Sequence, residues 1–163
     1  MPSVANRYVF PKLADVDVIS DVCQVLKDVL LPLLRLILNL LWFFTGGFAT
    51  GIAWLFGGLL LLLTVVGAPW AFSAWRIASY SFWPFGREIV WREPDASVLG
   101  AGCLGIGGNI IWLVLAGWYL AIGHLLLAVA QFISIIGIPF GLKNLELAKL
   151  SLAPVGRMIR AKT

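Results

Sequence analysis

Charged residues are scarce in this sequence. Lys, Arg, Asp and Glu make up 12% of its 163 residues, against about a quarter in an ordinary soluble domain, whereas 61% of residues are apolar. A surface in contact with water needs more charge than this, so a soluble globular protein is excluded. Disorder is excluded as well, because it requires low hydrophobicity and high net charge. The composition indicates an integral membrane protein.

Side chains suited to catalysis or metal binding are equally few. The chain has one histidine, His124, and two cysteines, Cys23 and Cys103, which have no CxxC spacing. Methionine occurs only at positions 1 and 158, so a haem with His or Met ligands is not expected. The acidic residues stand in basic segments, away from any candidate nucleophile. We therefore expect no enzyme activity, no metal and no cofactor.

Neither a nucleic-acid interface nor a cleavable signal peptide is expected. The net charge of +4 comes without any cluster of Lys and Arg interleaved with aromatic residues on a polar surface. The first 17 residues carry Arg7, Lys12, Asp15 and Asp17 and have no apolar core. The lipid bilayer is therefore the first expected partner.

The distribution of charge predicts the topology. Two runs without any charge, residues 36–75 and 96–142, are 40 and 47 residues long. About 20 helical residues cross the bilayer once, so each run predicts a hairpin of two crossings, or about four transmembrane helices in all. Turns are expected at Thr45-Gly46-Gly47 and within residues 117–123. Both termini and all twelve Lys and Arg then lie on the cytoplasmic side of a bacterial inner membrane, in agreement with the positive-inside rule.

The two halves of the chain are similar in sequence. A shift of 70 residues aligns residues 39–90 with 109–160 without a gap, and 13 of the 52 pairs are identical. Apolar bias does not explain why Gly, Pro, Asn and Trp coincide. We expect an all-α protein of two tandem repeats, residues 31–95 and 96–163, each a transmembrane hairpin plus a short interfacial segment. Their pseudo-symmetry axis is expected along the membrane normal.

A GxP motif follows each expected hairpin. Gly67 and Pro69 in the first repeat correspond to Gly137 and Pro139 in the second. Proline removes a backbone donor and glycine relaxes the backbone, so helices end or kink at such motifs. We expect these four hinge residues to end the second helix of each hairpin and to turn the chain along the interface.

Residues 1–30 form an N-terminal extension. Apolar residues recur with helical spacing from Ile19 to Leu33, with polar residues between them. This pattern predicts an amphipathic helix that runs to Pro32. It either packs on the bundle and headgroups or, since the spacing also fits a short heptad pattern, pairs with another helix.

Several motifs resemble the YccF family of small bacterial inner-membrane proteins. They are Asn109-x-x-Trp112-Leu113-x-x-x-Gly117-Trp118-x-Leu120-x-x-x-His124, Gln131-x-Ile133-Ser134-Ile135-Ile136-Gly137-Ile138-Pro139-x-Gly141 and, upstream, Gly46-Gly47-Phe48-Ala49-Thr50. The resemblance covers about residues 33–160, whereas residues 1–30 depart from it. It implies an inner-membrane location and this topology, and it brings no established activity.

Polar residues within the apolar runs are the candidate functional residues. Asn39 and Asn109 hold the same place in the two repeats, as packing contacts between helices or as contacts to a pore or ligand. His124, Gln131 and Ser134 share one helix face. His124 is either an interfacial residue near the outer end of its helix or a proton relay.

Two classes of function follow. The first is a homo-oligomeric channel or transport-like pore, because four short helices cannot enclose an aqueous path alone. The second is a non-conducting accessory or scaffold subunit packed against a larger membrane complex through its glycine-rich faces and its N-terminal helix. The absence of charge within the hairpins favours the second for cations, although carbonyl or hydrophobic constrictions also form pores.

Overall fold

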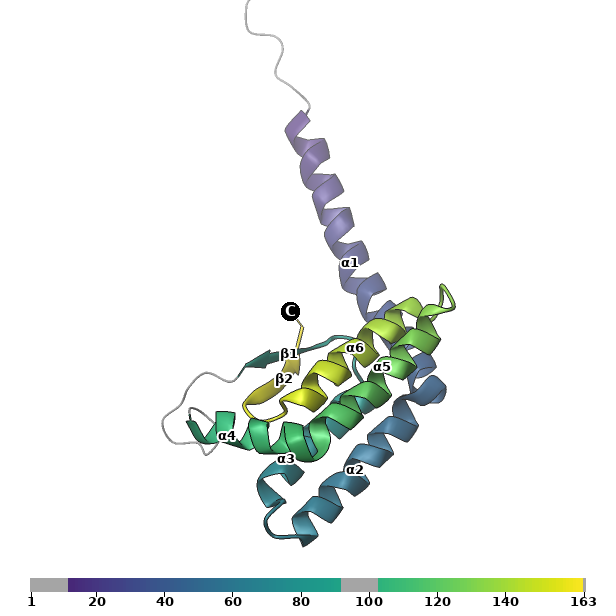
Figure 1. The fold of residues 1–163 in the computed structure, drawn as a ribbon. Helices are drawn as coiled ribbons and strands as arrows, with labels where there is room; N and C mark the ends of the chain where they lie inside the picture. The colour runs from purple at the N-terminus through teal and green to yellow at the C-terminus, as the bar shows by residue number, and fades with distance from the viewer. Residues whose placement is uncertain (1–11, 92–102, 163) are drawn as a thin grey trace, which may run out of the picture. The chain divides into compact units, whose positions relative to one another are not determined.

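The structure is a computed structural model that describes residues 12–91 and 103–162, and the chain divides into two compact units, residues 1–37 and 38–163. The described residues form six α-helices, two single π-helical turns and two strands (Figure 1). The helices are α1 (Lys12–Trp42), α2 (Phe48–Leu63), α3 (Ala68–Phe82), α4 (Cys103–Trp112), α5 (Trp118–Phe132) and α6 (Ile138–Leu152). The π-helical turns are η1 (Phe43–Gly47) and η2 (Leu113–Gly117), and the strands are β1 (Arg87–Trp91) and β2 (Arg157–Ala161).

The helical hairpins lie elsewhere than the sequence predicts. α2 packs against α3, and α5 against α6. The expected turn within residues 117–123 is wrong, because this segment is helical in η2 and α5. At Gly46, with φ 148°, the backbone is kinked between α1 and α2. The tight reversals occur instead at residues 64–67 and 133–137.

The GxP motifs form these reversals. Each motif does end a helix, as expected, but Pro69 and Pro139 then stand in the first turn of a new helix, where a missing N–H costs nothing. Helices α3 and α6, of 15 residues each, replace the short interfacial segments that the sequence predicts. The backbone N–H of Gly67 donates to Thr64 Oγ1, and that of Gly137 donates to Ser134 Oγ, which closes the two turns in the same way.

The fold is mostly helical, but it is not all-α. At two Pro-x-Gly-Arg motifs, residues 84–87 and 154–157, the chain turns into β1 and β2, which pair antiparallel. Gly86 and Gly156, with φ 90° and 82°, supply the left-handed backbone at these turns. Ile89 pairs with Ile159, its equivalent at a distance of 70 residues, at the centre of the ladder.

Burial places α3 and α6 inside unit 38–163 and α2 and α5 outside. The outer helices bury one stripe each: Gly51, Trp54 and Gly58 on α2, and Ala121, His124 and Ala128 on α5. The inner helices bury seven residues each. α3 also contacts β2, and Ile89 and Ile159 pack on the core, whose largest fully buried side chain is Trp42. The unit is therefore layered as outer helices, inner helices and sheet.

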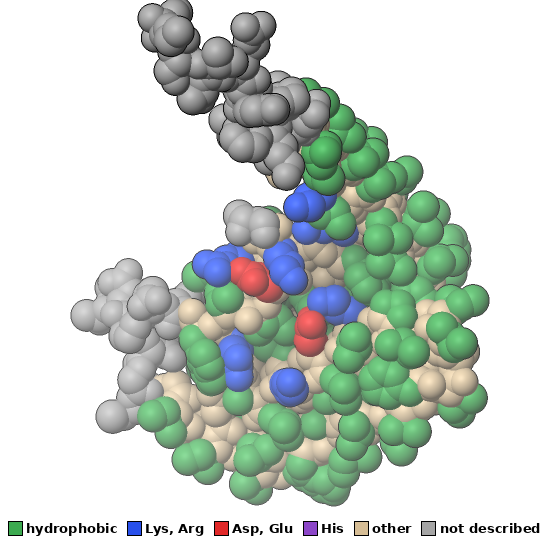
Figure 2. Space-filling view, turned by 90° about the horizontal axis from the view of Figure 1, so that it is seen from above, with side chains coloured by type: hydrophobic (Ala, Val, Ile, Leu, Met, Phe, Trp, Pro, Cys, Tyr) green, Lys and Arg blue, Asp and Glu red, His purple; other side chains and the backbone are tan. Residues whose placement is uncertain are grey.

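Charged side chains gather on one face of the molecule, over α6 and the strands, with apolar side chains around them (Figure 2). Two described helical stretches are long and apolar enough to cross a bilayer, Val18–Leu63 and Gly105–Phe132.

In unit 1–37, α1 continues through Pro32, so the predicted helix end there is wrong. Helices in apolar surroundings tolerate an internal proline when the freed carbonyl finds another partner. Side chains 18–34 are exposed on all sides of α1 within the described chain.

Candidate functional site

The two candidate asparagines hold the loops that lead into the strands. Asn39 Nδ2 donates to the Phe85 carbonyl oxygen at 2.9 Å, and Asn39 Oδ1 accepts from the Phe85 N–H at 2.9 Å. Asn109 makes the same two bonds to Val155, at 3.0 and 2.9 Å. Each side-chain amide thus pairs with both the N–H and the C=O of one loop residue, as a neighbouring β-strand would. Their hydrogen-bonding groups are turned into the protein.

A tryptophan three residues after each asparagine secures the same region. Trp42 Nε1 donates to the Ser81 carbonyl oxygen at 2.6 Å, and Trp112 Nε1 donates to that of Ser151 at 2.7 Å. These carbonyls belong to the last turns of α3 and α6, where no intrahelical N–H is left for them. The Asn-x-x-Trp motif therefore fixes one helix against the end of another in both halves.

His124 is the centre of a buried polar chain. The Trp54 indole N–H donates to His124 Nε2 at 3.2 Å, and His124 Nδ1 lies 3.0 Å from Asn144 Oδ1. Because Nε2 accepts, the neutral imidazole carries its proton on Nδ1, and this N–H donates a hydrogen bond to Asn144 Oδ1. Asn144 Nδ2 then donates to Gln131 Oε1 at 2.8 Å. His124 is only 6% exposed, so it does not lie on the protein surface.

This chain brings together two of the sequence candidates, His124 and Gln131, through partners that the sequence did not single out. Asn144 lies on α6 and Trp54 on α2, in the other half of the chain. Ser134 does not join them, because its hydroxyl caps the turn at Gly137. The one available signal was the 70-residue shift, which aligns His124 with Trp54.

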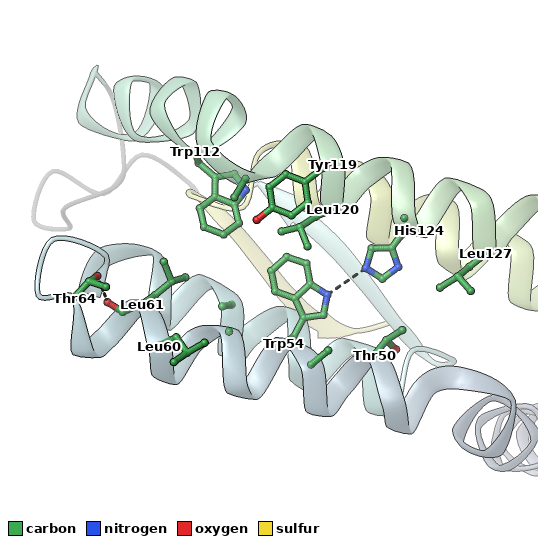
Figure 3. Close-up of a pocket in the computed structure, with 15 residues that line it drawn as sticks. Thr50, Trp54, Leu60, Leu61, Thr64, Trp112, Tyr119, Leu120, His124 and Leu127 are labelled. Atoms are coloured by element: carbon green, nitrogen blue, oxygen red, sulfur yellow. Dashed lines mark hydrogen bonds between the residues drawn. The ribbon is translucent and has the colours of Figure 1, made fainter.

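An apolar groove runs between α2 and α5, with the Trp54–His124 pair on its floor (Figure 3). The two helices run in opposite directions along it, and its volume is about 510 Å³. The hydroxyls of Thr50 and Thr64 face the groove, but they donate to the backbone carbonyl oxygens of Gly46 and Leu61, at 3.0 and 2.7 Å. The groove therefore offers mainly hydrocarbon surface.

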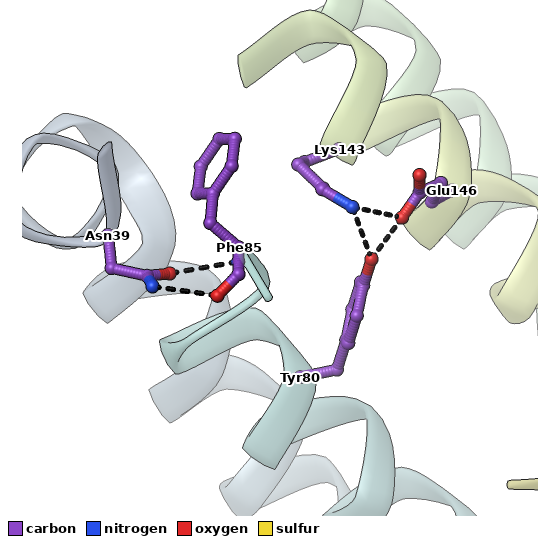
Figure 4. A network of polar contacts seen from close by, with 5 residues as sticks. All are labelled: Asn39, Tyr80, Phe85, Lys143 and Glu146. Carbon is purple, nitrogen blue, oxygen red and sulfur yellow. Dashed lines mark hydrogen bonds and ion pairs between the residues drawn. The ribbon is translucent and has the colours of Figure 1, made fainter. Parts of the chain in front are cut away.

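A second polar cluster joins the inner helices. Lys143 Nζ lies 2.7 Å from Glu146 Oε2 and 3.0 Å from the Tyr80 hydroxyl, which donates to the same carboxylate (Figure 4). Burial raises the pKa of Tyr80 well above its usual range, and Glu146 adds to this effect, so the phenol stays protonated. Sequence reasoning missed the cluster because Tyr80 lies 66 residues from Glu146.

Within residues 12–91 and 103–162, no group of three or more His, Cys, Asp or Glu side chains is placed to hold a metal ion. Cys23 is exposed and has a free thiol.

Comparison with known proteins assigns the chain to a family. The family model described as YccF, inner membrane component domain, matches twice, at residues 37–87 and 107–157. The protein belongs to the YccF family. It is 38% identical over 129 residues to the inner membrane protein YccF of Escherichia coli (strain K12), an alignment that covers 77% of this chain and 87% of the relative. The Shigella flexneri protein of the same name matches equally well. No solved structure matches the chain.

The two family matches begin 70 residues apart, at the same spacing as the paired contacts. Each YccF segment includes one Asn-x-x-Trp motif, one GxP turn and the first residue of one strand. Family membership supports an inner-membrane location for this protein.

Proposed function

We propose that this YccF-family protein is a non-conducting inner-membrane component, an accessory or scaffold subunit that packs against a larger membrane complex. The observation that carries the proposal is the inward use of its polar groups. Asn39, Asn109, His124 and Gln131 make their hydrogen bonds to the protein itself. A water-filled path needs polar groups that face the path. Two of these four bond to backbone groups, and the other two bond to the side chains of Trp54 and Asn144.

The proposal includes a tandem repeat. Residues 31–95 and 96–163 are two copies of one unit, each with an outer helix, a tight turn, an inner helix and a strand. The paired contacts of Asn39 with Phe85 and of Asn109 with Val155 support this division, as do the two YccF matches.

The proposal also includes an orientation. The sheet, α6 and both chain termini face the cytoplasm, since one face of the described part of unit 38–163 carries Arg87, Lys143, Lys149, Arg157 and Lys162. Cytoplasmic segments of inner-membrane proteins carry such an excess of Lys and Arg.

For the partner complex, α1 offers a free apolar surface. Apolar side chains along it are exposed within the described chain, for example Val18, Val22 and Val29, at 60%, 52% and 61%. A helix of this kind buries its apolar side chains when it meets a partner helix or lipid.

The test combines flux with assembly. Purified protein in liposomes is expected to leave ion and small-solute flux at the level of empty liposomes. Protein extracted in mild detergent is expected to migrate with a larger assembly, and the variant Val22→Asp/Val29→Asp is expected to separate from it. The matched control is Asp21→Asn/Asp28→Asn, which changes charged positions of the same helix.

The competing expectation is a homo-oligomeric pore. An oligomer of this chain alone that conducts in liposomes, and loses conduction in Asn39→Leu or Asn109→Leu while its size is unchanged, would overturn the proposal.

A further inference from the structure

The outer helices present a face without charge. α2 and α5 contain no Lys, Arg, Asp or Glu, and the side chains on their free sides are largely exposed in the protein itself. Phe56 and Leu126, equivalent at a spacing of 70 residues, are 63% and 65% exposed. In an inner-membrane protein, such an exposed apolar face is a contact surface for acyl chains.

The turns between the helices are apolar as well. Val66 and Ile136, which hold equivalent places in the two hairpin turns, are 79% and 75% exposed. Because α2 and α5 run in opposite directions, the two turns lie at opposite ends of the outer layer (Figure 3). Apolar surface therefore continues from the outer helices around their ends, and Figure 2 shows such side chains around the charged centre.

Two contacts join equivalent positions and so mark a local two-fold axis. Ile89 pairs with Ile159 at the centre of the sheet, and Trp54 donates to His124 on the groove floor. Members of each pair are 70 residues apart, and only residues near the axis can touch their own equivalents. The axis therefore runs from the charged sheet, between the inner helices, to the apolar groove.

The direction of this axis decides how the unit sits in a bilayer. If the axis lay in the membrane plane, α2 and α5 would cross as an inverted pair, and the sheet with Arg87 and Arg157 would face hydrocarbon at mid-depth. Charge at this depth is strongly unfavourable. If the axis lies along the normal, the sheet leaves the hydrocarbon and both outer helices lie at one depth. Neither helix then crosses.

We infer that the two hairpins of this protein are seated in the cytoplasmic leaflet, with the α2–α5 face buried among acyl chains and the sheet outside, and that they do not span the bilayer. The partner of this face is the hydrocarbon of one leaflet, including an acyl chain in the groove. The inference goes beyond the proposed function, since a spanning protein can also be non-conducting.

Accessibility of single cysteines in the native membrane tests the inference. In a Cys23→Ser/Cys103→Ser background, Val66→Cys, Trp118→Cys and Ile136→Cys are treated with a membrane-impermeant maleimide in spheroplasts and in inverted vesicles. All three are expected to stay unlabelled in both and to react in detergent. Lys162→Cys is the control and is expected to react only in inverted vesicles. Labelling of Trp118→Cys, Val66→Cys or Ile136→Cys in spheroplasts would show a crossing and overturn the inference.

Depth along α5 gives a second, independent readout. Cysteines at Tyr119 and Leu126 on α5 and at its C-cap Ile133, spaced by seven residues, carry a fluorophore in proteoliposomes whose lipids bear quenchers at defined acyl positions. A helix lying within one leaflet gives similar quenching depths at the three positions. A spanning helix places Leu126 near the midplane and the other two near opposite interfaces, about 20 Å apart. That result would overturn the inference and leave the non-conducting function standing, whereas flux in liposomes would do the reverse.

Discussion

Asn39 satisfies both backbone hydrogen-bonding groups of Phe85, with its amide as donor and its carbonyl oxygen as acceptor, at 2.9 Å each. The asparagine is 1% exposed, so water cannot replace these bonds. The loop between α3 and β1 is thus held by one side chain. Asn109 holds Val155 before β2 in the same way.

Asn39→Leu is expected to destabilise the protein, because it leaves the N–H and C=O of Phe85 unpaired, at about 1–3 kcal/mol for each buried group. Asn109→Leu has the same effect at Val155. The two amides have separate partners, so the double variant is expected to show the sum. Thermal unfolding in detergent measures this, with the exposed Gln24→Leu as control. Stability equal to the parent in both single variants would contradict the assigned contacts.

The polar chain at His124 is expected to respond to the loss of its central link. Asn144→Leu leaves both His124 Nδ1 and Gln131 Oε1 without their partner, whereas Trp54→Phe removes one donor and keeps an aromatic ring beside the imidazole. We expect Trp54→Phe to cost about 1 kcal/mol and Asn144→Leu two to three times as much. Unfolding midpoints in detergent rank the two variants. The reverse order would show that the indole ring, and not the amide, organises this region.

The sequence located the motifs, but it did not predict the contacts that they make in the folded protein. Asn39, Trp42 and the GxP motifs were found because a 70-residue shift aligns them, and such an alignment needs no knowledge of contacts. The turn expected at residues 117–123 is wrong, and Gly117 serves close packing instead. A Cβ at Gly117 would lie 3.1 Å from the Ser151 carbonyl oxygen. The helix therefore continues through Gly117, and the absence of a side chain lets the end of α6 pack closely against it.

The polar clusters could not be predicted, for a related reason. His124 meets Asn144 across a helix hairpin, and Tyr80 meets Glu146 from the other half of the chain. Such pairs depend on which helices are neighbours, and hydropathy alone does not specify this. The strands were missed since five residues after a Pro-x-Gly-Arg turn carry too short a pattern to separate a strand from a loop.

The hairpin turns are expected to tolerate the replacement of proline by alanine better than the replacement of glycine by alanine. Gly137→Ala places a Cβ against the Gln131 carbonyl oxygen, which belongs to the backbone and cannot move aside alone. We expect a loss of at least about 1–3 kcal/mol, as for other overpacked sites. Pro139→Ala is expected to cost less than 1 kcal/mol, about the gain in unfolded-chain entropy, because Pro139 starts a helix.

Gly57→Ala is the matched control for the glycine series, because nothing lies within 4 Å of a Cβ built at Gly57. It is expected to leave the unfolding midpoint unchanged or to raise it slightly, since alanine favours the helix by about 1 kcal/mol. Equal stability of Gly137→Ala and Gly57→Ala would contradict the turn geometry.

The last prediction concerns Tyr80 and pH. Its phenol is buried and keeps its proton in the folded protein, since its pKa is raised, whereas in the unfolded chain a tyrosine ionises near pH 10. Above that pH the unfolded state therefore binds fewer protons than the folded state, and stability falls as pH rises. Tyr80→Phe removes this contribution, so the variant is expected to be less stable at neutral pH, having lost its bonds to Glu146 and Lys143, and to lose less stability between pH 9 and pH 11. Tyr119→Phe is the control, because it removes the phenol of a tyrosine that is 50% exposed. Unfolding in detergent across this range measures both variants, and parallel curves for Tyr80→Phe and the parent would show that Tyr80 titrates normally and is not held by Glu146.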